Sequence, residues 1–161
     1  MSNKTGIVLL SHGSRLNYGR QVIEELADMY RKTTDYEVTV AFMEICEPNI
    51  PQAINKLIED KPDIERLVVV PVFLADGVHT KRDIPKILGI ASDEEDHDHD
   101  HGHGHHHGHH HGHDHGDEHD HHHHHHELET INFDGEIIYT SPLGADPRIV
   151  DIISDRVNNS L

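Results

Sequence analysis

The stretch RLVVVPVF at residues 66–73 is the most hydrophobic part of the chain. A short, nearly continuous run of valine and leucine is typical of a strand that lies inside a parallel sheet, where both faces are covered. We therefore predict that residues 66–73 form a buried strand of such a sheet.

Strand-like and helix-like segments alternate on either side of this stretch. Three more strands are predicted at residues 6–10, 36–42 and 136–139. Helices, with apolar residues at helical spacing, are predicted after a cap at Asn17 and over residues 48–58, 80–90 and 146–157. An alternating βαβα order predicts an α/β fold: a four-stranded parallel sheet with helices on both faces. At 161 residues the chain fits a single domain, residues 1–161.

Residues 93–129 differ in composition from the rest of the chain. Between Asp96 and Glu127 lie 19 of the 21 histidines, separated only by glycine, aspartate and one glutamate. With almost no apolar side chains, this segment cannot form a core, and we expect a disordered loop inserted before the last strand. Neutral imidazole binds Ni²⁺, Co²⁺, Zn²⁺ and Cu²⁺. The tract could donate metal, buffer it or merely tolerate it, and composition does not choose among these roles.

The charge balance narrows the range of partners. The formal net charge is −17, but residues 93–129 hold 12 of the 30 acidic residues, which leaves 18 acids against 13 bases elsewhere. A mildly acidic domain argues against nucleic acid as a partner, because phosphate binding needs clustered Lys and Arg. No apolar run approaches a membrane span and no signal pattern is present, so we expect a soluble cytoplasmic protein. The single cysteine, Cys46, excludes an internal disulfide and a thiolate metal cluster.

Only two histidines, His12 and His79, lie outside the tract, and each follows a predicted strand. Ligands of open α/β sheets bind beyond the carboxyl ends of the strands. If the two strands are near neighbours, both imidazoles face one crevice, and Glu44 and Glu47 reach the same edge from the second strand. Such a set suits a divalent ion with open coordination positions, and it suits proton removal near neutral pH. The plainer alternative is two loop histidines that make local hydrogen bonds.

Four blocks of sequence resemble one known family. They are LSHGSR at 10–15, MEICEPNIP at 43–51, VPVFLADGVHTKRDIP at 70–85 and PLGAD at 142–146. In this order they resemble the short, single-domain class II chelatases, which are archaeal sirohydrochlorin cobaltochelatases and include the nickelchelatases of coenzyme F430 biosynthesis. The resemblance covers both flanks of the tract, and family members often have a His-rich insertion at this place.

The resemblance implies ATP-independent insertion of Co²⁺ or Ni²⁺ into sirohydrochlorin, a lyase reaction that serves cobalamin or coenzyme F430 biosynthesis. It implies that His12 binds the metal and accepts a proton, and that His79 is a metal ligand. It places the tetrapyrrole against Glu47 and against Leu74, Ala75, Asp76, Gly77, Val78 and His79. Asp76 occupies a variable position of the family, where an acid could add a ligand or tune the charge. No prosthetic group is implied, because the metal is a substrate.

The chemistry of the residues agrees with this expectation. Metal insertion into a tetrapyrrole requires the loss of two pyrrole protons and the stepwise exchange of metal ligands. Two neutral imidazoles meet both needs, whereas a closed four-ligand site would trap the ion. A domain of this size is too small to enclose a tetrapyrrole, so we expect a homodimer or a dimer of dimers.

Two other functions remain open at this point. A phosphatase-like enzyme could use a histidine after the first strand, but it would need arginines around the phosphate, and the residue before His12 is Ser11; Arg15 and Arg82 could supply charge. A non-enzymatic nickel or cobalt store, or a metallochaperone, could depend on the tract alone. Such a protein would need neither His12 nor His79.

Overall fold

A computed structural model describes residues 4–90 and 130–161, apart from the side chains of Val78 and His79. The His-rich segment at 93–129 lies outside the described residues. The elements, in chain order, are β1 (Thr5–Ser11), α1 (Asn17–Arg31), β2 (Glu37–Phe42), α2 (Ile50–Asp60), β3 (Arg66–Pro71), α3 (Val78–Leu88), β4 (Glu136–Tyr139) and α4 (Pro147–Ser160).

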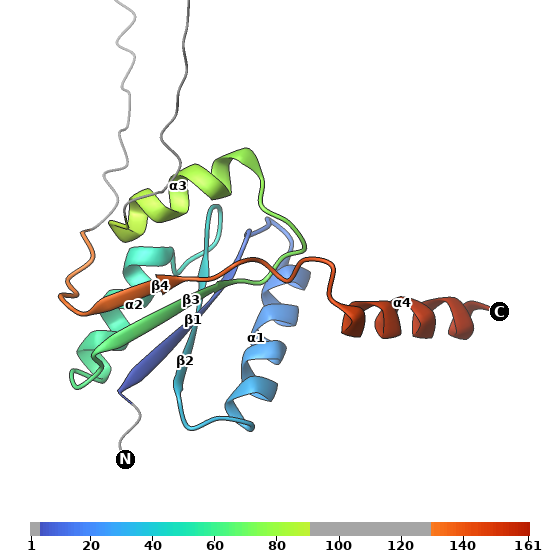
Figure 1. Ribbon diagram of the computed structural model, residues 1–161, viewed down its shortest axis with the longest axis horizontal. Helices are drawn as coiled ribbons and strands as arrows, with labels where there is room; N and C mark the ends of the chain where they lie inside the picture. The colour runs from blue at the N-terminus through green and yellow to red at the C-terminus, as the bar shows by residue number, and fades with distance from the viewer. Residues whose placement is uncertain (1–3, 91–129) are drawn as a thin grey trace, which may run out of the picture. The chain divides into compact units, whose positions relative to one another are not determined.

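The strands form one parallel sheet in the order β2-β1-β3-β4 (Figure 1). β1 is therefore central, and Leu10 pairs with Ala41 of β2 on one side and with Pro71 of β3 on the other. The predicted four-stranded parallel sheet with helices on both faces is confirmed. The neighbourhood of β1 and β3, on which the predicted crevice depends, is also confirmed.

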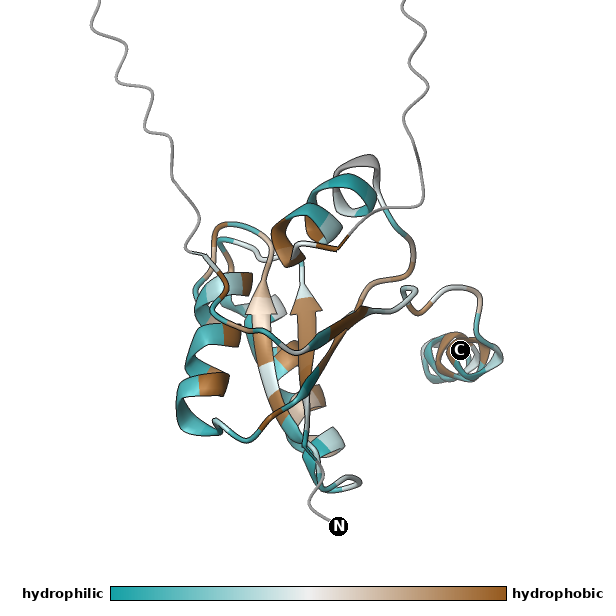
Figure 2. Cartoon of the chain, turned by 60° about the vertical axis from the view of Figure 1, so that its left-hand side comes forward, coloured by the Kyte–Doolittle hydropathy of each residue, from teal (hydrophilic) through white to brown (hydrophobic). Residues whose placement is uncertain are grey.

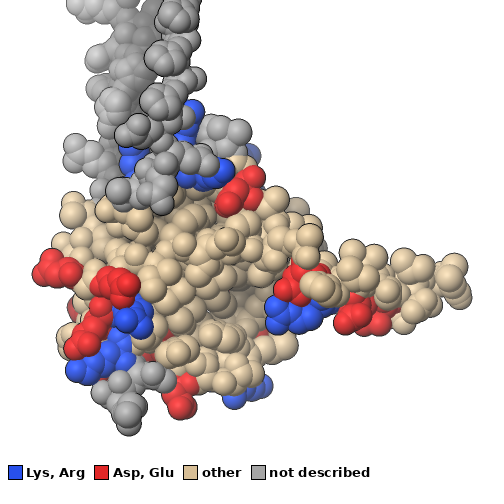
Figure 3. Space-filling view, viewed as in Figure 1, with Lys and Arg blue, Asp and Glu red and all other residues tan. Residues whose placement is uncertain are grey.

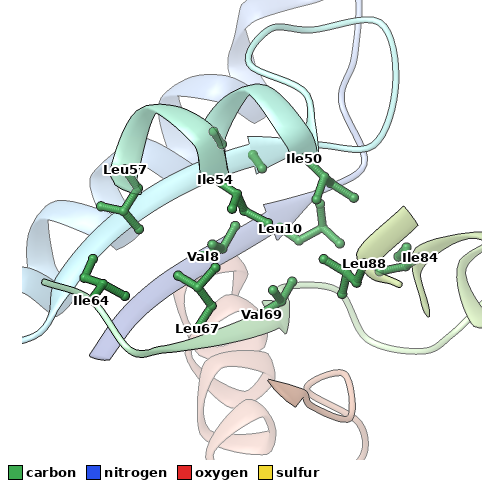
Figure 4. Close-up of a cluster of buried hydrophobic side chains, with 12 residues drawn as sticks. Val8, Leu10, Ile50, Ile54, Leu57, Ile64, Leu67, Val69, Ile84 and Leu88 are labelled. Carbon is green, nitrogen blue, oxygen red and sulfur yellow. The ribbon is translucent and has the colours of Figure 1, made fainter. Parts of the chain in front are cut away.

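Alternate residues of β1 face opposite layers of the protein, as the pleat of a strand requires. Val8 and Leu10 are fully buried in the layer of α2 and α3, where they lie with Ile54, Ile84 and Leu88 (Figure 4). Ile7 and Leu9 face α1 and lie in a second cluster with Ile23, Ala27, Val38 and Phe42. Burial of β1 on both faces explains why this central strand is an unbroken hydrophobic run rather than an alternating one.

The helices start one or two residues away from the predicted positions. α3 begins at Val78, two residues before the predicted start, because the backbone N–H of Gly77 donates to the Thr80 hydroxyl at 2.7 Å and so fixes the first turn. α3 ends at Leu88 and is capped by Gly89, whose positive φ of 69° suits a C-terminal cap. Asn17 is the first residue of α1 rather than its cap, which is Leu16.

α4 is the one described helix with no buried residue. Its start is well defined, because the carboxylate of Asp146 accepts a hydrogen bond from the backbone N–H of Arg148 at 2.9 Å. The Arg148 guanidinium also donates to this carboxylate, at 2.6 Å and 2.8 Å, and holds the pKa of Asp146 well below its usual range. In the part of the chain that the structure describes, no helix is long and apolar enough to cross a membrane.

Candidate functional site

The site begins where β1 and β2 end, because the two chains keep pairing beyond the strands. The backbone N–H of Met43 donates to the carbonyl of Ser11 at 2.9 Å, and that of Glu44 donates to the carbonyl of His12 at 3.2 Å. This extension of the parallel ladder places Glu44 beside His12 at the carboxyl edge of the sheet. Of the two acids considered from the sequence, Glu44 is therefore the one that the backbone holds next to the histidine.

Gly13 makes this close approach possible. Its φ is +90°, and a Cβ at this position would overlap the carbonyl oxygen of Glu44. The turn opposite it is equally tight: Ile45 has a positive φ of 68°, and the Cys46 thiol donates to the carbonyl of Ser14 at 2.9 Å. These contacts lock the turn after His12 against the turn after Glu44.

The other side of His12 faces the end of β3. The backbone N–H of Val72 donates to the carbonyl of Leu10 at 2.8 Å, which extends the β1–β3 pairing. The imidazole of His12 stacks on the Phe73 ring, with centroids 4.3 Å apart and the planes inclined by 32°. His12 is nonetheless exposed to solvent, so its ring nitrogens can reach a metal ion or a substrate.

The segment after β3 is fixed at both ends. Thr80 is buried with 3% of its surface exposed, and its hydroxyl donates back to the carbonyl of Gly77 at 2.9 Å. On the other side, the N–H groups of Leu143 and Gly144 donate to the carbonyls of Phe73 and Leu74, both at 2.9 Å. Leu74, Ala75, Asp76 and Gly77 are all exposed, and they form one rim of the site.

A cleft of about 420 Å³ lies between these segments. Its lining residues are His12, Met43, Glu44, Ile50, Gly77, Thr80, Asp83, Ile84 and Ile87. One imidazole and two carboxylates thus open into a largely apolar hollow under α3. Sequence reasoning gave Glu44 no definite role and did not single out Asp83, which lies four residues after His79 and therefore on the same helical face.

The predicted site residues are not all brought together equally. Glu47 is exposed and does not line the cleft; its carbonyl accepts a hydrogen bond from the Arg20 side chain. The Arg20 guanidinium also lies 5.2 Å from the centroid of the Phe42 ring, so α1 holds this loop in place. His79 lies in the first turn of α3, next to the cleft residues Gly77 and Thr80, but its side chain is outside the described part of the structure.

Among the described side chains, no three His, Cys, Asp or Glu gather closely enough to hold a metal ion.

A buried hydroxyl group lies near the end of β4. It belongs to Tyr139 and has no hydrogen-bond partner among the described residues. Burial, together with the negative charge of Asp76, raises the pKa of Tyr139 to about 12, so the phenol keeps its proton at neutral pH. Among the described side chains, His12 is the only histidine at this edge of the sheet.

The fold and the site define an α/β protein with an exposed histidine past the central strand of a parallel sheet, beside a carboxylate and an apolar cleft. Comparison with known proteins gives the family. The sequence pattern of the CbiX family matches residues 6–160, and the chain belongs to that family.

Named relatives agree with this assignment. The chain is 49% identical over 158 residues to a sirohydrochlorin cobaltochelatase of Methanothermobacter thermautotrophicus, covering 98% of this chain and 94% of the relative. It is 50% identical over 151 residues to that of Methanocaldococcus jannaschii, covering 93% and 95%. The predicted membership of the single-domain class II chelatases is confirmed, and with it the class of enzyme, a metal chelatase.

A solved structure has the same fold. A putative cobalamin (vitamin B12) biosynthesis CbiX protein from Marinobacter aquaeolei superimposes with a TM-score of 0.58, at 21% identity, over 97% of this chain and 96% of that one. At this identity the similarity supports the fold alone.

Proposed function

We propose that this chain inserts Co²⁺ into sirohydrochlorin without ATP, and that it also accepts Ni²⁺. The observation behind the proposal is the placement of an exposed His12 beside Glu44 at the mouth of an apolar cleft. Two close relatives are named sirohydrochlorin cobaltochelatase. Cobalt and nickel prefer similar ligands, so the same site suits both ions and either cobalamin or coenzyme F430 biosynthesis.

In this proposal the metal is a substrate that the protein holds briefly. His12 and His79 bind the ion, and Glu44 adds a carboxylate. Few protein ligands leave open positions through which the pyrrole nitrogens replace them one at a time. Once His12 releases the metal, it accepts a pyrrole proton, since neutral imidazole is the usual general base of enzymes near neutral pH.

The exposed rim from Leu74 to Gly77, together with Val78, His79 and Glu47, is proposed to bind the tetrapyrrole. The rim ends at the N-terminus of α3, whose partial positive charge attracts carboxylates of the substrate. A cleft of about 420 Å³ is at the low end for a site that encloses a small molecule, and a tetrapyrrole is large and flat. We therefore infer that a second copy of the chain covers the substrate, in a homodimer or a dimer of dimers.

The His-rich tract is proposed to serve as a metal reservoir. Its 19 histidines and the acids among them are ligands for the same ions that the site uses. The competing function is a non-enzymatic store or metallochaperone, in which the tract alone is responsible and the cleft is incidental. The two functions predict different effects on Co²⁺ insertion when the tract is removed.

Replacement of residues 96–127 by a short Gly-Ser linker is expected to leave Co²⁺ insertion unchanged at saturating metal and to slow it at limiting metal. The reason is that the tract raises the local metal concentration without taking part in the reaction. The absorbance change of sirohydrochlorin measures insertion, and equilibrium dialysis measures the number of Co²⁺ ions bound per chain. Loss of insertion at saturating Co²⁺ would contradict the reservoir role, and absence of insertion by both proteins would favour the store.

A further inference from the structure

The Tyr139 hydroxyl is a buried polar group to which the proposed chemistry gives no role. Its oxygen has no hydrogen-bond partner among the described residues. Tyr139 is the last residue of β4, pairs with Val69 of β3 and packs against the hydrophobic cluster under α2 and α3. Figure 2 shows hydrophobic residues along the strands of this sheet. Buried polar groups are nearly always hydrogen-bonded, so an unpaired hydroxyl in such surroundings calls for an explanation.

The hydroxyl lies near the rim of the proposed site. Beyond β4 the chain stays bonded to the segment after β3, through the N–H groups of Leu143 and Gly144, each 2.9 Å from its acceptor carbonyl oxygen. This segment leads to Asp76, an exposed residue of the rim whose negative charge helps to raise the pKa of Tyr139 to about 12. The phenol therefore keeps its proton, and it is a donor within electrostatic range of a carboxylate.

Asp76 is an acid at a place where the substrate brings its own carboxylates. The neighbouring helix has positive charge that suits such a substrate: Lys81, Arg82 and Lys86 lie on α3, and Figure 3 shows Lys and Arg side chains over this helix, at the top of the view. The carboxylate of Asp76 repels an anion instead. The repulsion grows when the substrate displaces water from the rim, because the local dielectric constant falls. Asp76 then needs a hydrogen-bond donor in place of water.

We propose that Tyr139 is a positioning residue of the rim: when the anionic substrate binds, the phenol donates a hydrogen bond to the carboxylate of Asp76 and draws it away from the substrate. The inference rests on the proposed function, since it concerns the binding of the same tetrapyrrole. A hydrogen bond to a charged acceptor is stronger than one between neutral groups. Because the donor is unpaired in this structure, pairing it on binding favours the substrate-bound state. Asp76 thus tunes the charge of the rim rather than holding the metal.

Tyr139→Phe, which removes only the hydroxyl, is expected to raise the Kd and the KM for sirohydrochlorin about tenfold and to leave kcat at saturation unchanged. The unfolding temperature should equal or exceed that of the wild type, because the lost hydroxyl has no partner among the described residues. A fluorescence titration with metal-free sirohydrochlorin measures the Kd, and the cobalt assay measures KM and kcat. A hydroxyl with a merely structural role would show the reverse, a lower unfolding temperature and an unchanged Kd.

Tyr36→Phe is the matched control. Tyr36 is also half-buried, but it packs against the cluster on the other face of the sheet. This variant should bind sirohydrochlorin with the wild-type Kd. An unchanged Kd in Tyr139→Phe, or an equal rise in Tyr36→Phe, would overturn the proposal whatever the unfolding temperatures.

A double-mutant cycle tests whether Asp76 is the partner. In an Asp76→Ala background, Tyr139→Phe should change the Kd for sirohydrochlorin by less than about twofold, because the acceptor is gone. A tenfold effect in both backgrounds would overturn the pairing. The titration contains no metal, so it separates the two proposals. A wild type that binds sirohydrochlorin and inserts no metal would contradict the proposed function alone, and one that does not bind it would overturn both.

Discussion

Replacement of either His12 or His79 by alanine is expected to lower the rate of Co²⁺ insertion into sirohydrochlorin by a factor of about a hundred or more. Loss of a positioned proton acceptor alone has an effect of this size, and each variant also loses a metal ligand. His12 is exposed, so His12→Ala should unfold at the same temperature as the wild type. Insertion is measured by absorbance at saturating Co²⁺, with thermal unfolding followed in parallel.

His97→Ala is the matched control, because it removes one imidazole from the tract and none from the site. It should insert cobalt at the wild-type rate. Near-normal turnover in His12→Ala or in His79→Ala would remove that residue from the proposed site, while a similar loss in His97→Ala would shift the chemistry to the tract.

Gly13→Ala is expected to destabilise the protein by roughly 2–4 kcal/mol and to lower its unfolding temperature by about 10 °C. The backbone at Gly13 has a φ of +90°, and the added methyl group would overlap the carbonyl oxygen of Glu44. The turn must open to relieve that overlap, which moves Glu44 away from His12. Cobalt insertion should therefore fall even at temperatures where the variant stays folded. Calorimetry and the absorbance assay measure the two effects separately.

Gly19→Ala provides the control for the same substitution in an unstrained place. Gly19 lies in α1, and a Cβ there would meet nothing within 4 Å. Alanine in a helix is favoured over glycine by about 0.5–1 kcal/mol, so this variant should be as stable as the wild type or slightly more stable. A Gly13→Ala protein with wild-type stability would show that the turn after His12 is not locked against the turn after Glu44.

The architecture was predicted well from the sequence because the hydrophobicity of the strands and the order of strand-like and helical segments indicate the same fold. The run at 66–73 is hydrophobic without alternation since β3 contributes side chains to both hydrophobic clusters, and the alternation of strands with helical segments leaves one arrangement, a parallel sheet. Helix starts were harder. The helix predicted over residues 80–90 begins two residues earlier, at Val78, through hydrogen bonds between Gly77 and Thr80, and these bonds depend on the folded geometry.

The site could be predicted only in part. The position of His12 follows from the rule that ligands bind past the carboxyl ends of strands, and this needs no contact map. The choice between Glu44 and Glu47 does need one, because both acids follow β2. Glu44 reaches the cleft since its N–H pairs with the carbonyl of His12, whereas Glu47 is exposed outside the cleft, in the loop whose backbone Arg20 holds.

The most direct test of the account is the rate at which the purified wild-type protein inserts Co²⁺ and Ni²⁺ into sirohydrochlorin in the absence of ATP, followed by absorbance with a protein-free reaction beside it. The account predicts that cobalt insertion is faster than in the protein-free reaction by orders of magnitude, that nickel is also inserted, and that two protons are released for each metal ion. A cobalt rate equal to that of the protein-free reaction, or one that requires ATP, would contradict it.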